Sequence, residues 1–179
     1  MYSQEEIRTK VNDFIAQLEY TREPKALYEP ITYTLQQGGK RIRPVAFIMA
    51  YNLFKEEIEA ALYPAVAMEV YHNYTLIHDD VMDKADIRRG KPTVWTKWGE
   101  NPAILSGDTM LVLAYEFITQ VADDKLRETL ALFSEMAKEI GEGQQYDMEF
   151  ETRDNVTEAE YINMIRLKTS VLIANCMKL

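Results

Sequence analysis

The chain has 179 residues, 47% of them hydrophobic, a net charge of −9 and a single cysteine. This length and composition are typical of one globular domain and exclude a disordered chain. An acidic surface disfavours nucleic acid as a partner, and one cysteine excludes an internal disulfide framework and favours a reducing compartment.

Neither end of the sequence nor its interior contains a segment typical of membrane or secreted proteins. The first residues, Met1 to Glu6, have no basic and then apolar pattern of a signal peptide. No apolar run approaches the roughly 18 residues that a membrane span needs. We therefore expect a cytoplasmic protein with no membrane span.

The predicted elements are all helices. Apolar residues recur every three or four positions in seven segments: 5–20, 24–37, 44–54, 60–83, 102–121, 123–150 and one that begins at about 157. Gly38 and Gly39 end the second segment, Pro44 suits the first turn of the third, and Thr157 with Glu160 forms a capping box. Gly107 is expected to interrupt the fifth. The sequence predicts an all-α domain of about seven helices with no second domain.

Three carboxylates close the fourth helix, at Asp79, Asp80 and Asp83. Asp79 and Asp83 are four residues apart, so they share one helix face, and like charges at that spacing cost a few tenths of a kcal/mol. Hard divalent cations such as Mg²⁺ would offset this repulsion. A metal site and a solvated helix end are both open on this evidence.

His72 lies two helical turns before Asp79 and so projects from the same stripe. It is either a core histidine or a donor, neutral or cationic, to a diphosphate held beside the carboxylates. Glu69 and His72 also form the ExxH unit of di-iron bundles. Such sites need a second unit, which His78, the other histidine, does not supply.

Two basic turns complete the pattern. The first, at 38–44, reads GGKRIRP and leads into a helix N-terminus, where backbone N–H groups and cations favour phosphate. The second contains Arg88, Arg89 and Lys91. Each turn alone is weak evidence, because most runs of Lys and Arg are solvated. Together with the carboxylates they indicate a site for an anion and a metal ion.

In these motifs the chain resembles the trans-prenyltransferases, the polyprenyl diphosphate synthase family. The segments that carry the resemblance are GGKRIRP at 38–44, HDDVMDKADIRRGKPT at 78–93, GDTML at 107–111, GQQYD at 143–147 and KTS at 168–170. The resemblance implies an isoprenoid synthase helical bundle around a central cavity. It also implies head-to-tail condensation of isopentenyl diphosphate with an allylic diphosphate, Mg²⁺ as cofactor, and a homodimer.

The resemblance implies a role for each matching residue. Asp79, Asp80 and Asp83 would bind the Mg²⁺ that bridges the allylic diphosphate, and Lys168 and Thr169 would steady the allylic cation. The substrate-binding positions would be Arg88 for the allylic diphosphate, Lys40, Arg43, His72 and Arg89 for isopentenyl diphosphate, and Gln144 and Asp147 at the same cavity. Asp147 is expected to pair with Lys168, and Asp108 to have a structural hydrogen-bonding role.

Product length is expected to depend on Tyr74 and Thr75. Tyr74 lies five residues before Asp79, about 7.5 Å along a helix, and in the family a bulky residue there closes the chain-length pocket. The small Thr75 and the lack of an insertion between Asp80 and Asp83 favour a C20 product, with C15 next. Ordinary core packing of Tyr74 is the alternative.

Other functions fit less well. A terpene cyclase binds one diphosphate and lacks the GGKRIRP turn, and a non-catalytic partner subunit is expected to lose aspartates that are all present here. No carboxylate follows Thr169, so the second aspartate-rich motif of the family has no counterpart. We therefore expect residues 1–179 to be the N-terminal part of a single synthase domain, truncated and inactive alone, with a non-catalytic fragment as the alternative.

Overall fold

The computed structural model describes residues 1–18 and 22–179, and these segments are almost entirely helical. The helices and the two short strands have the following bounds: α1 Gln4–Gln17, α2 Lys25–Gln36, α3 Ile42–Tyr51, α4 Glu59–Met82, β1 Ile87–Arg88, β2 Lys91–Pro92, α5 Val94–Trp98, α6 Glu100–Ile118, α7 Asp123–Phe150, α8 Glu158–Ile165, the π-helical segment η1 Arg166–Ser170, and α9 Val171–Asn175. The all-α fold class predicted from the sequence is confirmed.

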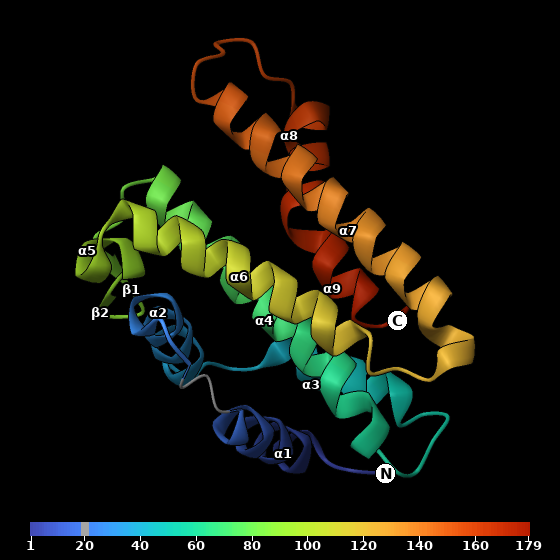
Figure 1. The fold of residues 1–179 in the computed structure, drawn as a ribbon. Helices are drawn as coiled ribbons and strands as arrows, with labels where there is room; N and C mark the ends of the chain where they lie inside the picture. The colour runs from blue at the N-terminus through green and yellow to red at the C-terminus, as the bar shows by residue number, and fades with distance from the viewer. Residues whose placement is uncertain (19–21) are drawn as a thin grey trace.

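The long helices α4 and α6 form the centre of the molecule and pack along much of their length. Figure 1 shows them side by side, with α1 to α3 on one flank and α7 with the continuous α8–η1–α9 rod on the other. Helix α4 is apolar on nearly all sides, which is typical of a helix surrounded by others. Its buried side chains, with those of α1, α3 and α6, make one core.

Helix boundaries follow local signals in the sequence. Ser3 and Thr157 each cap a helix, and both capping boxes have the reciprocal hydrogen bonds to Glu6 and Glu160. Helix α1 ends at Gln17; the predicted extension to residue 20 reaches positions outside the described segments. Helix α3 ends at Tyr51, three residues before the predicted end.

The fifth predicted helix needs a correction. Helix α6 runs unbroken from Glu100 to Ile118, so Gly107 does not interrupt it. A side chain at Gly107 would place its Cβ only 2.3 Å from Nε2 of His78 on α4. Gly107 is therefore a close-contact residue between two helices, and such a glycine costs a helix only about 1 kcal/mol.

The sequence prediction also missed the short elements between α4 and α6. A two-residue hairpin, β1 with β2, and the one-turn helix α5 fill this connection. Elements of two to five residues are too short for any hydrophobic period to develop. With α5 added and α8–η1–α9 counted as one helix, the described segments contain eight helices instead of about seven.

None of the helices in the described segments combines the length and the apolar character that a bilayer crossing requires.

Candidate active site

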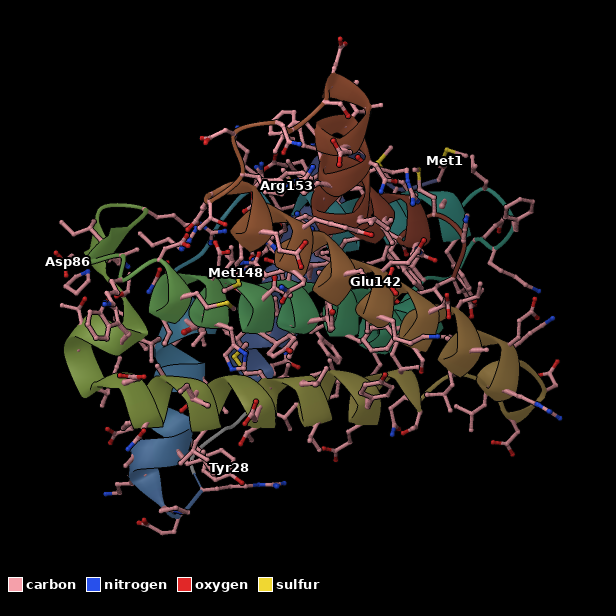
Figure 2. All side chains as sticks on the ribbon, turned by 90° about the horizontal axis from the view of Figure 1, so that it is seen from above. Met1, Tyr28, Asp86, Glu142, Met148 and Arg153 are labelled. Carbon is pink, nitrogen blue, oxygen red and sulfur yellow. The ribbon has the colours of Figure 1, made fainter. Side chains whose placement is uncertain are left out.

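A cavity of about 360 Å³ opens beside the carboxylate end of α4. This volume is in the range of pockets that hold small organic ligands. Helices α4 and α7 and the segment η1 contribute most of its wall. Figure 2 shows α7, on which Glu142 and Met148 are labelled, crossing over α4. Met148 is one of the lining side chains.

The cavity brings together many residues that the sequence singled out. The predicted site residues that line it are Arg43, His72, Tyr74, Thr75, Asp79, Gln144, Lys168 and Thr169. They come from segments up to 126 positions apart (169 minus 43), so only the fold places them together. The structure thus gathers predicted site residues of α3, α4, α7 and η1 around one space.

The other six predicted residues do not line this cavity. Asp80, Arg88 and Arg89 line a smaller hollow against α2 and α5. Asp147 contacts Lys168 from the last turns of α7. Two residues lie further out: Lys40 and Asp83 are exposed, one in the first basic turn and the other just after α4.

The carboxylates of α4 are paired with cations. Nε of Arg88 donates to Oδ1 of Asp80 at 2.7 Å, and Nη2 of Arg88 lies 3.4 Å from Oδ2 of Asp79. Nζ of Lys168 lies 3.4 Å from Oδ1 of Asp79. Asp79 therefore has a cation on each side, while Asp80 is buried against Arg88.

Lys168 joins two helices through its ammonium group. It donates to Oδ2 of Asp147 at 2.5 Å, the pairing that the resemblance implied, and it also reaches Asp79. Partial burial is the largest influence on the pKa of Lys168 and lowers it, but the hydrogen bond to Asp147 and the charge of Asp79 outweigh this and raise the pKa overall. Lys168 is a cation at neutral pH.

The backbone of η1 explains how Lys168 reaches this position. The turn is π-helical, and such turns often occur at functional sites because they redirect a side chain. Segment η1 packs tightly on α7 at Gly143, where a Cβ would lie 2.3 Å from the backbone nitrogen of Lys168. The glycine of the GQQYD motif is thus the point of contact between the two helices.

His72 is neutral in this site. Burial lowers its pKa to about 3, and the charges of Arg43, Arg89 and Arg88 act in the same direction. The sequence left a neutral and a cationic donor open, and the structure favours the neutral one. A neutral imidazole still carries one N–H donor and one acceptor.

The first basic turn is held by a residue that is not in the predicted site. Arg41 has a left-handed backbone (φ 50°), and its guanidinium is buried. It donates to Oε1 of Glu69 at 2.8 Å, to the carbonyl of Leu35 at 2.7 Å and to Oδ1 of Asn12 at 3.1 Å. The three cations of the first basic turn therefore have different environments. Arg41 is buried and structural, Lys40 is exposed, and Arg43 lines the cavity.

The two basic turns touch each other. Nη1 of Arg89 donates to the carbonyl of Gly38 at 2.9 Å, and its guanidinium lies against the open face of Gly39. Arg89 itself has a positive φ of 53°. The structure therefore joins two segments 50 residues apart into one cationic surface beside His72.

Arg43 supplies a donor without a partner. Its Nε is buried and makes no hydrogen bond with any described residue. Burial lowers the pKa of Arg43, although a guanidinium stays charged at neutral pH. A buried donor left open beside a cavity suits a bound anion, which would satisfy it.

The aspartates suit a divalent cation only if a bound ligand supplies further oxygen atoms to it. Loss of hydration, extensive at the buried Asp80 and slight at the exposed Asp83, raises the pKa of both carboxyl groups, and in both the charge of Asp79 adds to this effect. A cation would relieve that repulsion. Within the described residues no three or more acidic, histidine or cysteine side chains converge on a metal position. Mg²⁺ characteristically takes one or two carboxylates and completes its shell with water and phosphate oxygens, so the donor set fits a jointly bound Mg²⁺ and diphosphate.

Sequence reasoning missed about half of the lining residues. These are Tyr71, Leu76, His78, Met82, Ala137, Ile140, Gly141, Gln145, Met148 and Leu172. On α7, Ile140, Gly141 and Met148 lie three or four positions from Gln144 and Ala137 lies seven, so helical periodicity from Gln144 would have found these four but not Gln145. Most of the missed residues are apolar, and the interior of the cavity is therefore suited to a hydrocarbon chain.

The fold and the site define an all-α bundle with an apolar cavity whose mouth holds carboxylates and cations. The chain belongs to the polyprenyl synthetase family, whose model matches residues 24–179. A geranylgeranyl diphosphate synthase of Methanosarcina mazei is 46% identical over 158 residues, 87% of this chain and 49% of that protein. A short chain isoprenyl diphosphate synthase of Methanocaldococcus jannaschii is 46% identical over 86% of this chain and 47% of its own.

Solved structures agree with the sequence relatives. A crystal structure of a geranylgeranyl pyrophosphate synthase matches 99% of this chain and 54% of its own, with a TM-score of 0.96 and 44% identity. The geranylgeranyl pyrophosphate synthetase from Geoglobus acetivorans matches 97% and 57%, with a TM-score of 0.92 and 39% identity. The chain spans about half the length of the curated relatives it matches.

Proposed function

We propose that this chain carries the substrate-binding part of a short-chain trans-prenyl diphosphate synthase, which condenses isopentenyl diphosphate head-to-tail with an allylic diphosphate. The observation that carries the proposal is that Asp79, Lys168 and Arg43, from three separate elements, line one apolar cavity. The names of the geranylgeranyl diphosphate synthases among the relatives support a C20 product. A C15 product comes next on the sequence resemblance alone.

In this proposal, different residues of the site bind the two diphosphates. Asp79, Asp80 and Asp83 would hold Mg²⁺, which supplies charge neutralisation for the departing diphosphate, and Arg88 would add to it. Lys168 and Thr169 would stand beside the allylic carbon, with Gln144 and Asp147 behind them. An apolar, water-poor cavity protects the allylic cation from hydrolysis.

The joined basic turns would bind the second diphosphate. Lys40, Arg43, neutral His72 and Arg89 would bind isopentenyl diphosphate and hold its double bond at reacting distance. The orphaned Nε of Arg43 supports this assignment. The homodimer and the cytoplasmic location are further proposals, which rest on the family resemblance and on the single cysteine.

Simultaneous binding of two diphosphates tests the proposal. Calorimetry on this chain with Mg²⁺ should show an uncleavable allylic analogue, a thiolodiphosphate, binding both before and after saturation with isopentenyl diphosphate. Arg43→Ala should weaken isopentenyl diphosphate by about tenfold or more and leave the allylic analogue nearly unchanged. Competition between the two ligands for one site would contradict the proposal and favour a protein that binds one diphosphate, such as a terpene cyclase.

A further inference from the structure

Two residues of the GDTML segment on α6 have no part in the proposed chemistry, yet both contact the same side chain of α4. That side chain is His78. Nε2 of His78 lies against Gly107, where a Cβ would come within 2.3 Å of it, and 3.6 Å from Oδ1 of Asp108. Nε2 also donates to the carbonyl of Ile104 at 3.2 Å. Helix α6 therefore fixes the orientation of the His78 ring.

The His78 ring in turn contacts Tyr74, one helical turn earlier on α4. The two ring centroids are 4.8 Å apart with an interplanar angle of 65°, an edge-to-face arrangement. On its other side Tyr74 lies 5.3 Å from the ring of Tyr71. All three rings line the cavity.

Apart from these ring contacts, the side chain of Tyr74 is restrained among the described residues only by packing against the hydrophobic core. Its hydroxyl makes no hydrogen bond with them, whereas Tyr71 donates to the carbonyl of Ala137 and is fixed by it. Tyr71 also packs edge to face on Phe133 of α7. The orientation of the Tyr74 ring therefore depends on packing alone, and of its two ring neighbours His78 is the one held by α6.

We propose that His78 is a specificity-determining residue: it positions the ring of Tyr74 and so sets the length of the prenyl chain that the cavity admits. The inference rests on the proposed function, since it assumes a prenyl chain in this cavity. If the His78 ring is removed, a space opens between Gly107 and Tyr74. The Tyr74 ring can then turn toward α6 and leave the cavity, which becomes deeper.

The effect on binding follows from burial of apolar surface. Each buried methylene contributes about 0.8 kcal/mol, so one additional isoprene unit that finds room contributes far more than a factor of ten in affinity at full burial. Partial burial of the added unit would give a smaller gain in affinity, which would still be measurable. We expect the preference for a C25 over a C15 chain to rise about tenfold in His78→Ala.

The test measures affinities of this chain, with saturating Mg²⁺, for thiolodiphosphate analogues of C10, C15, C20 and C25 prenyl diphosphates. His78→Phe keeps a ring edge against Tyr74 and should keep the wild-type preference within a factor of about three. His78→Asn keeps a donor for the Ile104 carbonyl but loses the ring, and should behave like His78→Ala. Tyr74→Ala is the positive comparison, because it removes the proposed obstruction directly.

Two further variants separate positioning from general destabilisation. Gly107→Ala crowds the His78 ring from the α6 side and opens no space beside Tyr74, so it should destabilise the chain without raising the C25 to C15 preference. Phe14→Leu removes an edge-to-face partner of Tyr63 outside the cavity. It should lower the unfolding temperature while leaving the chain-length preference as in the wild type.

The outcomes are distinguishable. An unchanged preference in His78→Ala and His78→Asn, with a raised preference in Tyr74→Ala, overturns the role of His78 and leaves the proposed function standing. A wild-type chain that binds none of the analogues overturns the proposed function and the inference together. A raised preference in His78→Ala and His78→Asn, but not in His78→Phe, Gly107→Ala or Phe14→Leu, supports the inference.

Discussion

At the scale of single residues, Lys40 and Arg41 show that neighbours in one basic run can have different roles. Arg41 is buried and bonded to Glu69, whereas Lys40 is exposed. Asn73 donates to the carbonyl of Glu69, and the pair lies beneath the first basic turn. Composition and spacing could not separate the two cations, because burial depends on how α1, α2 and α4 meet around Arg41.

This difference gives a prediction for stability. Arg41→Met leaves the carboxylate of Glu69 buried without its cation, so the free energy of unfolding should fall by roughly 3–5 kcal/mol. Lys40→Met should change it by no more than about 0.5 kcal/mol and should weaken isopentenyl diphosphate instead. Urea unfolding of both variants measures the contrast; equal losses would show that Arg41 is not the anchor of the turn.

His72 gives a prediction for pH dependence. Its pKa in the folded chain is about 3, below the usual 6.5 of an exposed histidine. A lowered pKa means that the unfolded chain binds the proton more readily. The stability contributed by neutral His72 is therefore complete above about pH 6.5 and is lost as the pH falls toward 3.

Unfolding at pH 7 and pH 5 checks this sign. The wild type should lose roughly 1–2 kcal/mol more than His72→Gln over this interval, since glutamine has no proton to bind. The carboxylates titrate alike in both proteins and cancel in the comparison. An equal loss in the two proteins would show that His72 is not held neutral by the fold.

At the scale of elements, the docking of η1 on α7 depends on one glycine and not on its neighbour. A Cβ at Gly143 would meet backbone atoms of Leu167 and Lys168 at 2.3 to 2.8 Å, which a flexible side chain cannot relieve. A Cβ at Gly141, two residues earlier, would meet nothing within 4 Å. The two positions are a matched pair on one helix.

Alanine at these positions should therefore have opposite effects. Gly143→Ala should lower the free energy of unfolding by roughly 1–3 kcal/mol and separate Lys168 from Asp147. Gly141→Ala should raise it by up to about 1 kcal/mol through helix propensity. Thermal unfolding followed by circular dichroism distinguishes them, and a stabilised Gly143→Ala would mean that the two helices do not meet this closely.

The elements also show what the sequence could predict. Long helices such as α4 and α7 follow from hydrophobic periodicity, and the capping box at Thr157 from local chemistry. The π-helical turn at Lys168 and the contact of Gly107 with His78 could not be predicted, because each depends on the approach of a second helix. The polar residues at the cavity mouth were found through motifs, but most of the apolar lining was not.

At the scale of the whole molecule, the proposed site has two anion positions beside a single cluster of aspartates. We expect the 179-residue chain alone to bind diphosphates without efficient condensation, because one carboxylate cluster supplies only part of a metal clamp for the leaving group. A radiolabelled assay with an allylic diphosphate, isopentenyl diphosphate and Mg²⁺ measures this. Carbon–carbon bond formation at about 1–10³ s⁻¹, as in typical enzymes, would contradict it.

Calorimetry can measure whether Mg²⁺ and a diphosphate bind jointly at Asp79 and Asp80. A bisphosphonate titrated into the wild-type chain should bind at least about tenfold more tightly with Mg²⁺ than without it, because the phosphate oxygens complete the metal shell. In Asp80→Ala the affinity should no longer depend on Mg²⁺. A wild-type affinity that is the same with and without Mg²⁺, or an Asp80→Ala variant that keeps the full dependence, would remove these aspartates from the site.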